Sequence, residues 1–420
     1  MKSTWKNGRV KDLIDYLESG VSVNGEDRAP SDTESAVLKV SAVSYGVFDP
    51  GASKLIIGQE LKRAKCNPKA GQIIVSRSNT PDLVGASAFI ARDYPNRYLP
   101  DKLWQTVPKK DVASDLRWLA YYLASSWARF RLSRLATGTS DTMKNITQDE
   151  LLTLPVLIPP FPEQVVIADL LSTWDAAIEK TERLIAAKEG RFKGLVQRLI
   201  TEPSKTNGCW KHFRIRDIAK RIQRVAKGEA LPILTIASSS GFVLQKEKYS
   251  RYMAGESVKN YICLRRGEFA YNKGNSLRFQ FGCIFELMEY EAALVPHVYV
   301  CFKLNSGVDP NYLGHLFAAD YLKRQLGAIV KTGIRNNGLL NIKPDEFMDV
   351  TVPMPLFKEQ QQIAATLNTA RDEIDLLKKQ AEAFRRQKRG LMQKLLTGEW
   401  RVRVGEGDTD EQRLTGTYKD

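Results

Sequence analysis

The fold is decided by the stretch from Glu163 to Ile200, which reads EQVVIADLLSTWDAAIEKTERLIAAKEGRFKGLVQRLI. Its apolar residues recur at alternating steps of four and three, and polar Thr181 and Lys188 occupy two of these positions. A repeat of 3.5 residues predicts a long helix that pairs with one partner helix along a heptad seam.

The partner lies in the same chain. Residues Glu359 to Leu396 read EQQQIAATLNTARDEIDLLKKQAEAFRRQKRGLMQKLL, and a shift of 196 positions lays them on the first stretch. The apolar steps recur, with Lys388 at one seam position. The residues that we expect to begin the two helices and line their coiled-coil seam are Glu163, Gln164, Ile167, Leu171, Trp174, Ile178, Glu359, Gln360, Ile363, Leu367, Ile374 and Leu391.

The repeat extends beyond the long helices. A W-K-x-x-R-[VI]-[KR]-D-[LI] pattern begins at Trp5 and again at Trp210, and a glycine-led apolar strand begins at Gly71 and again at Gly267. A period this long indicates a tandem duplication, roughly 1–202 and 203–404, and not a solenoid. Each half reads as strands, then a helix at about 114–135 or 310–330, then prolines before the long helix.

These patterns predict a mixed α/β fold. Two tandem α/β domains are joined by two long helices that form an antiparallel coiled coil, and an approximate two-fold axis relates the halves. The predicted domains are 1–158 and 203–354, the long-helix segments are 159–202 and 355–404, and a disordered tail covers 405–420.

Charge and cysteine content bound the function. The net charge is +15, of which residues 1–162 carry +5 and residues 201–357 carry +8, so the globular segments favour a polyanionic partner. The five cysteines form no C-x-x-C pair, which predicts free thiols in a reducing compartment. We find no signal-like start and no apolar run long enough to span a bilayer, so we expect a soluble cytoplasmic protein.

Catalytic patterns are missing or incomplete. Pro159-Pro160-Phe161 is like the core of an adenine methyltransferase motif, but Ile158 stands where that motif needs Asn or Asp. We find no G-x-x-x-x-G-K-[ST] loop for a nucleotide, and the three histidines are isolated from cysteine clusters. We therefore expect no catalytic residue, bound metal or cofactor on this chain.

The chain resembles the DNA-specificity (S) subunit of type I restriction–modification systems. The resemblance rests on the E-Q-x-x-I-A-x-x-L helix starts at Glu163 and Glu359, each preceded by prolines, and on the G-L-x-Q helix ends at Gly194 and Gly390. These features occur twice in the same order, and the resemblance spans about residues 5–404.

The resemblance implies that the two globular domains are target-recognition domains. Each would read one half of a bipartite double-stranded DNA sequence, while the long helices space them and dock two methyltransferase (M) subunits. Restriction/translocase (R) subunits would join that core, and S-adenosylmethionine, ATP and Mg would bind on the partner subunits. A docking role for the Glu-Gln pairs rests on this resemblance alone.

Three pairs of corresponding polar loops are candidates for DNA contact. They lie after the glycine-led strand, in a later Gly-containing loop and just before the glycine-led strand. Arg suits guanine and Asn suits adenine in the major groove, although phosphates are equally reachable and a solvated loop is the alternative. The candidates in these loops are Arg77, Ser78, Asn79, Lys273, Asn275 and Arg278; Thr139, Ser140, Arg335 and Asn336; and Lys62, Arg63, Arg265 and Arg266.

Other interpretations remain open. Basic residues near helix ends, at 129, 131, 134, 323 and 324, suit either phosphate contact or a solvated helix face. The chain could instead be a coiled-coil scaffold that binds only proteins, or a stand-alone DNA enzyme. It could also be the specificity subunit of a related methyltransferase-only or type II-like system.

Replacement of residues 1–158 by another recognition domain should change one half of the methylated DNA motif and leave the other half intact. The physical reason is that each domain of a tandem duplication has its own core. Methylome sequencing of cells that carry the chimaera and its partner subunits is the measurement. A change in both half-sites would contradict the prediction that each domain determines one half-site.

Overall fold

The computed structural model shows two compact units. Unit 1 comprises Met1–Thr181 and Gln380–Asp420, and unit 2 comprises Glu182–Lys379. The structure describes residues 5–140, 143–202, 210–225, 231–248, 256–274, 276–330 and 339–404. The predicted tail 405–420 lies outside the described residues. Among the described residues, no helix combines the length and apolar character needed to cross a bilayer.

Unit 1 is built on a four-stranded sheet in the order β10-β8-β12-β2. Its strands are β1 (Lys6–Arg9), β2 (Ile14–Ser19), β3 (Gly25–Glu26), β4 (Ala36–Leu38), β5 (Val43–Ser44), β6 (Val47–Phe48), β7 (Ser53–Ile56), β8 (Ile73–Ser76), β9 (Ser78–Asn79), β10 (Ser87–Phe89), β11 (Arg97–Tyr98), β12 (Leu103–Pro108), β13 (Thr137–Ser140), β14 (Met143–Asn145) and β15 (Pro155–Ile158). Its helices are α1 (Leu116–Ala124), α2 (Ser126–Leu135), α3 (Gln148–Leu152) and the first part of α4 (Phe161–Val196).

Unit 2 is built on a four-stranded sheet in the order β22-β21-β24-β17. Its strands are β16 (Lys211–Arg214), β17 (Ala219–Ile222), β18 (Leu234–Ala237), β19 (Gly241–Leu244), β20 (Ile262–Arg265), β21 (Phe269–Asn272), β22 (Cys283–Glu286), β23 (Ala292–Val295), β24 (Val300–Leu304) and β25 (Thr351–Met354). Its helices are α6 (Ile215–Ile218), α7 (Gln245–Lys248), α8 (Pro310–Ala318), α9 (Lys323–Ile329), α10 (Pro344–Met348) and the first part of α11 (Phe357–Leu396).

The two sheets share one topology. Strand β8 of unit 1 and strand β21 of unit 2 occupy the same place in the order, and both are flanked antiparallel by their neighbours. Each follows a turn glycine at positive φ, Gly71 at +77° and Gly267 at +79°, a conformation that favours glycine. The two glycine-led strands predicted from the sequence are therefore confirmed, and so is the mixed α/β class.

One sequence prediction was wrong in both units. The helices expected at 114–135 and 310–330 are each two helices, because the helical conformation is interrupted at Ser125 in unit 1 and around Asp320 in unit 2. Ser125 is extended and its Oγ accepts a bond from Ala128 N (3.3 Å), so it caps α2, and Asp320 adopts a φ of +55°. In both units the local backbone conformation ends the first helix, although the periodic apolar residues continue beyond that point.

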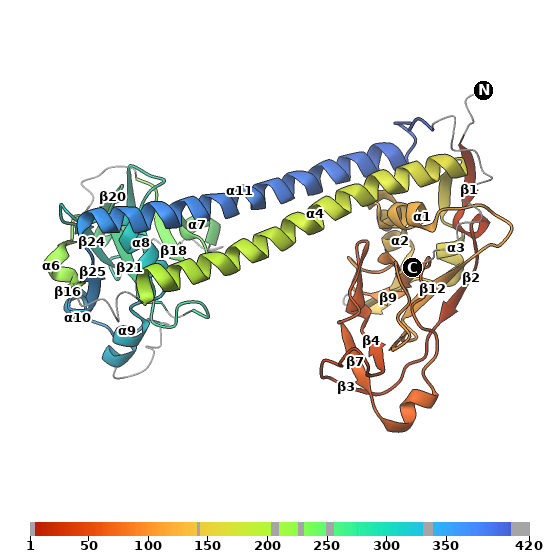
Figure 1. Ribbon diagram of the computed structural model, residues 1–420, viewed down its shortest axis with the longest axis horizontal. Helices are drawn as coiled ribbons and strands as arrows, with labels where there is room; N and C mark the ends of the chain where they lie inside the picture. The colour runs from red at the N-terminus through yellow and green to blue at the C-terminus, as the bar shows by residue number, and fades with distance from the viewer. Residues whose placement is uncertain are drawn as a thin grey trace. The chain divides into compact units, whose positions relative to one another are not determined.

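The long helices run antiparallel within each unit (Figure 1). In unit 1 the rings of Trp174 and Phe384 lie 5.7 Å apart, and Lys388 pairs with Asp175 at 2.5 Å. In unit 2 the paired residues are Lys188 with Glu373 (2.5 Å) and Glu189 with Lys378 (2.6 Å). Residue numbers rise along α4 as they fall along α11. Helix α4 ends in a π-helical turn, Gln197–Thr201.

The helix starts are part of the cores of their units. Ile167, Ala168 and Leu171 of α4 pack in the core of unit 1, together with Leu395 and Leu396 from the far end of α11. The corresponding residues of α11 pack in the core of unit 2 with Ile200; they are Ile363, Ala364 and Leu367. Burying leucine or isoleucine stabilises by about 1.5–3 kcal/mol per side chain, so each unit holds one helix start and one helix end firmly.

A buried glutamine ties the start of α4 to unit 1. Gln164 Oε1 accepts a bond from Asp115 N, and Gln164 Nε2 donates to Pro159 O, both at 2.9 Å. The neighbouring carboxylate of Glu163 accepts a bond from Trp5 Nε1 (3.0 Å). One Glu-Gln pair therefore connects the helix start, the N-cap of α1 and the residue before β1.

Unit 2 repeats the same bonds. Gln360 Oε1 accepts from Asp309 N and Gln360 Nε2 donates to Pro355 O, again at 2.9 Å. Trp210 Nε1 donates to Glu359 Oε1 (3.2 Å). Asp309 caps α8 as Asp115 caps α1, so the duplication reaches the level of individual hydrogen bonds.

The substitution Gln360→Met should lower the free energy of unfolding by about 2 kcal/mol, because it leaves the buried Asp309 N–H and Pro355 carbonyl unpaired. The melting temperature measured by scanning calorimetry should fall by roughly 2–6 °C. Gln361→Met is the matched control, since Gln361 is the next residue and is exposed. Equal losses in the two variants would contradict the bridging role of Gln360.

Candidate nucleic-acid interface

Two of the predicted unit 1 loops meet in one small sheet. The three strands run β13-β14-β9, with Lys144 opposite Asn79 and Asn145 opposite Ser78. Strand β9 therefore pairs with β14, and β14 separates it from β13, so the candidates at 77–79 and at 139–140 belong to one sheet although about sixty residues separate them in the sequence. Backbone pairing thus gathers the two loops in one small sheet of unit 1.

The side chains of β9 and of Arg77 beside it are only partly available for contact with DNA, because several of them are buried or bonded within unit 1. Ser78 is buried, and the guanidinium carbon of Arg77 lies 5.7 Å from the ring centroid of Trp104. Asn79 Nδ2 donates to Ser76 Oγ (3.2 Å), and its Oδ1 accepts from Thr80 N (2.9 Å). The buried Nε of Arg77 has no hydrogen-bond partner among the described residues. Of the three candidates at 77–79, Arg77 therefore has an N–H group that still needs an acceptor.

The remaining unit 1 candidates differ in how they are held. The side chains of Thr139 and Ser140 lie outside the described residues, although their backbone forms β13. Arg63 pairs with Glu60 (2.9 Å), whose carboxylate also accepts a bond from Asn24 N (2.9 Å). Arg63 therefore braces a turn. Lys62 ends the short 3-10 helix before it and is exposed.

Unit 2 brings together the corresponding loops. Leu340 N donates to Lys273 O (3.0 Å), and Gly274 forms a bridge with Leu339. Lys273 Nζ donates to Ile342 O (3.1 Å), so part of this ammonium group is used inside the unit. Of the other candidates in these two loops, Asn275, Arg335 and Asn336 lie outside the described residues.

An exposed leucine marks the end of the unit 2 loop. Ser276 and Phe279 close a tight turn, because Ser276 N donates to Phe279 O (3.1 Å) and Phe279 N donates to Ser276 Oγ (3.0 Å). The turn leaves Leu277 fully exposed beside Arg278, whose guanidinium carbon lies 5.2 Å from the ring centroid of Phe279. Sequence reasoning missed Leu277, since only the turn shows that none of the described residues covers this side chain.

The basic pair before the unit 2 glycine strand is exposed at its side chains. Arg265 closes β20, and its backbone N–H donates to Glu268 Oε2 (2.7 Å). Arg266 pairs with Glu291 at 3.0 Å, where the carboxylate side chain is 83% exposed. A pair this exposed contributes little stability, so Arg266 is available for another partner.

A further basic surface lies on α2. We define the arginine–aromatic face as Trp127, Phe130, Arg131 and Arg134, which are exposed opposite the buried Ala128 and Leu132. The guanidinium carbon of Arg131 lies 4.3 Å from the ring centroid of Trp127, and that of Arg134 lies 5.7 Å from Phe130. Trp127 is 41% and Phe130 is 63% exposed.

The charges of this face are not neutralised within the described part of the chain. Arg131 and Arg134 form no ion pair with a described residue. Arg129, on the side of α2, instead donates to Asp82 O (2.9 Å), and its guanidinium carbon lies 3.5 Å from the ring centroid of Tyr45. Two cations held against aromatic rings suit phosphate oxygens, because guanidinium groups bind phosphate at low cost in side-chain entropy.

The predicted seam residues are mostly interior. Glu163, Gln164 and Gln360 are buried by contacts within their own units, and Glu359 is half-buried. Ile167, Leu171, Ile363, Leu367 and Ile374 are buried, while Trp174, Ile178 and Leu391 are half-buried. The Glu-Gln pairs thus have a structural function inside each unit.

The described residues offer little for covalent chemistry. Burial raises the pKa of the Cys283 thiol to about 11 and that of Cys301 to about 12, so both thiols stay protonated and weakly nucleophilic at neutral pH. Among the described residues, no group of three or more His, Cys, Asp or Glu is arranged to hold a metal ion. What the described surface offers instead is hydrogen-bond donors on the candidate loops: guanidinium groups, such as those of Arg266 and Arg278, and the ammonium groups of Lys62 and Lys273.

Comparisons with known proteins point to one family. Residues 2–188 match the family described as type I restriction modification DNA specificity domain. A putative type I restriction enzyme MjaX specificity subunit of Methanocaldococcus jannaschii is 22% identical over 95% of this chain and 94% of its own length. The EcoKI specificity subunit of Escherichia coli K12 is 22% identical over 87% of this chain and 83% of its own length.

Solved structures show the same fold. The S subunit of a type I restriction–modification system from M. genitalium has a TM-score of 0.57 at 15% identity, and the match covers 94% of this chain and 97% of that one. A chain from a type I R-M complex has a TM-score of 0.52 at 14% identity, with 95% and 99% covered. Residues 2–188 thus match the type I restriction–modification DNA-specificity domain, and most of the chain is similar to specificity subunits of such systems.

Proposed function

We propose that this specificity subunit reads one bipartite double-stranded DNA target, with one half-site for each unit. The observation that carries the proposal is a shared scaffold with different loop residues. Both units repeat the sheet order and the Glu-Gln bonds, yet Arg77-Ser78-Asn79 of unit 1 corresponds to Lys273-Gly274-Asn275 of unit 2. Different donors on one scaffold favour two half-sites of different sequence.

The subunit has no catalytic step of its own in this proposal. Two methyltransferase subunits and the restriction/translocase subunits would dock on it, and S-adenosylmethionine, ATP and Mg would bind to those partners. The support is the family match, together with outer faces of the long helices that carry exposed side chains such as Leu170 and Leu376. The cytoplasm, where DNA and partners are present, is the proposed location.

The arginine–aromatic face supports a nucleic acid over a purely protein partner. Arg131 and Arg134 lie on α2, whose end leads directly into β13 of the small sheet that gathers the unit 1 loops. We assign these two arginines to the phosphate backbone, where they would orient unit 1 without reading bases. Leu277 and Arg278 at the tip of the unit 2 loop are suited to a base edge, since an apolar side chain can contact a thymine methyl group.

The double substitution Arg131→Gln with Arg134→Gln should weaken binding of target duplex by the assembled complex. Each lost phosphate contact should reduce the slope of log K against log salt by about 1, and target and non-target duplexes should be affected alike. Fluorescence anisotropy of labelled duplexes over a salt series is the measurement.

Lys6→Gln with Lys11→Gln is the matched control. Both lysines are exposed in unit 1, at β1 and just after it, so the control removes the same charge from a different surface. Its salt slope should stay within experimental error of the wild type. Salt-independent binding by the wild-type complex, or no duplex binding at all, would overturn the proposed function and favour a protein scaffold.

A further inference from the structure

A polar cluster joins the long helices in unit 1. Asp175 Oδ1 accepts a bond from Lys388 Nζ (2.5 Å), and Asp175 Oδ2 accepts from Tyr121 Oη (2.7 Å). The ammonium group of Lys388 lies 5.0 Å from the ring centroid of Tyr121, and the Lys388 side chain is only 18% exposed. We call these three residues the unit 1 cluster.

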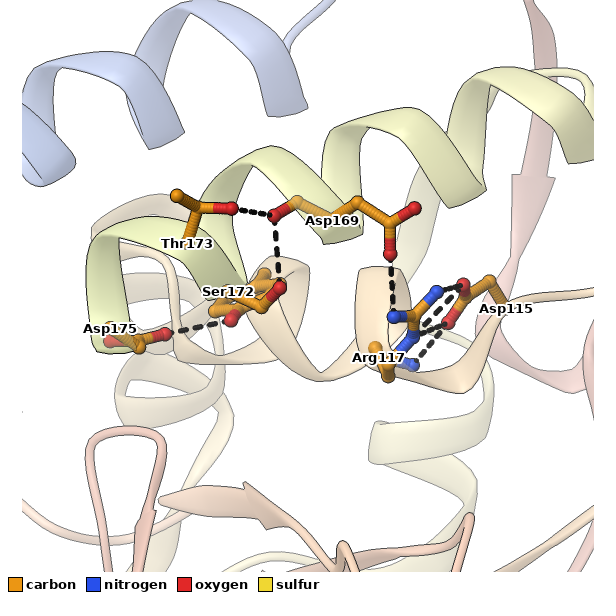
Figure 2. Close-up of polar contacts among 7 residues, drawn as sticks. Asp115, Arg117, Asp169, Ser172, Thr173 and Asp175 are labelled. Atoms are coloured by element: carbon orange, nitrogen blue, oxygen red, sulfur yellow. Dashed lines mark hydrogen bonds and ion pairs between the residues drawn. The ribbon is translucent and has the colours of Figure 1, made fainter. Parts of the chain in front are cut away.

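The turn that carries Asp175 is itself held in place, as Figure 2 shows. Asp169, on the preceding turn of α4, accepts a bond from Arg117 Nη1 (2.7 Å), and Arg117 also pairs with Asp115 (2.5 Å). Thr173 Oγ1 donates back to Asp169 O (2.9 Å). These bonds fix this part of α4 against α1, and the bonds from Tyr121 and Lys388 direct the carboxylate of Asp175 toward α1 and α11.

A different cluster occupies unit 2. The guanidinium carbon of Arg371 lies 5.4 Å from the ring centroid of Phe192, and the His315 ring lies 6.1 Å from the same ring. His315 Nε2 lies 2.7 Å from Asn368 Oδ1, and burial lowers the pKa of His315, so the neutral ring donates this bond at pH 7. We call Arg371, Phe192 and His315 the unit 2 cluster.

The two clusters occupy corresponding positions on the long helices, but their residue types cannot be exchanged between clusters without losing a favourable pair. The 196-residue shift that relates the long helices carries Asp175 onto Arg371 and Phe192 onto Lys388. At the same place on the seam, unit 1 pairs an anion with a cation, whereas unit 2 pairs a cation with an aromatic ring. Duplication has thus kept the positions and changed the pairing.

We propose that these clusters select α11 as the partner of α4 and reject a second copy of the same helix. Two antiparallel copies of α4 would place Asp175 of one chain against Phe192 of the other. Two copies of α11 would place Arg371 against Lys388. The first contact leaves the carboxylate of Asp175 without a cation, and the second brings the exposed guanidinium group of Arg371 against the largely buried ammonium group of Lys388. Both contacts cost free energy, because an ion pair is lost in the first and like charges meet in the second.

The helices of a duplicated chain have a particular need for such selection. Their apolar seam residues recur at the same spacing, so apolar packing alone distinguishes poorly between α4 with α11 and α4 with another α4. Polar and charged seam residues supply the difference, as specificity devices do in other helix pairs. The seam is therefore an interaction surface for the other helix of the same chain. This inference is independent of the DNA proposal.

The test exchanges one member of each cluster in the full-length chain. Phe192→Lys with Lys388→Phe leaves Asp175 beside an aromatic ring and Arg371 beside a cation within each chain. Between chains, the same exchange creates matched pairs for α4 with α4 and for α11 with α11. We expect the melting temperature to fall by roughly 3–8 °C. We also expect mass measurements by light scattering to show dimers whose fraction rises with concentration, while the wild type stays monomeric.

A fourfold variant supplies the matched control. Adding Asp175→Arg and Arg371→Asp to the exchange restores one cation–aromatic pair and one ion pair within the chain, with the two clusters traded between units. This variant should regain at least half of the lost melting temperature and return to monomer. An exchange variant with the melting temperature and mass of the wild type would overturn the proposal, as would a fourfold variant no better than the exchange variant.

Discussion

The side-chain amide of one glutamine in each unit is the interaction on which the remaining architecture depends. Gln164 and Gln360 are buried, and each satisfies one N–H and one carbonyl that would otherwise be unpaired at a helix start. Because each links the proline before the long helix to the N-cap of an earlier helix of the same unit, α1 or α8, it fixes where the long helix leaves its unit. The neighbouring glutamates add an indole bond from Trp5 and Trp210.

Much of this scaffold follows from the sequence. The heptad steps, the shift between the helices and the glycine-led strands are local sequence patterns. Such patterns predict structure well where the same apolar residues also form the core. The break at Ser125 could not be predicted in the same way, because the apolar stripe continues to Phe130, which proves to be 63% exposed. The cap from Ser125 and the packing of Leu132 against Gly85 set the direction of α2. Neither contact appears in the periodicity of apolar residues along the sequence.

The candidate interface was predictable in position and much less so in detail. The sequence placed polar loops at corresponding points, but only the sheet β13-β14-β9 shows that two of them share one sheet, on either side of β14. Arg63 and Lys273 use part of their donor capacity inside the unit, which a linear pattern cannot reveal. Conversely, the exposure of Leu277 and the stacking of Arg131 and Arg134 on exposed aromatic rings became visible only in the structure. In the proposed function, two copies of one scaffold with different surfaces are the physical basis for reading two different half-sites.

The methylome of cells that express this chain with its partner subunits reports directly whether each unit reads its own half-site. Two units of shared topology but different loop residues predict one methylated motif in two parts, with unlike half-sites separated by a gap of unspecified bases. A single uninterrupted motif would contradict the assignment of one half-site to each unit. Two identical half-sites would contradict the claim that the differing loop residues read the bases.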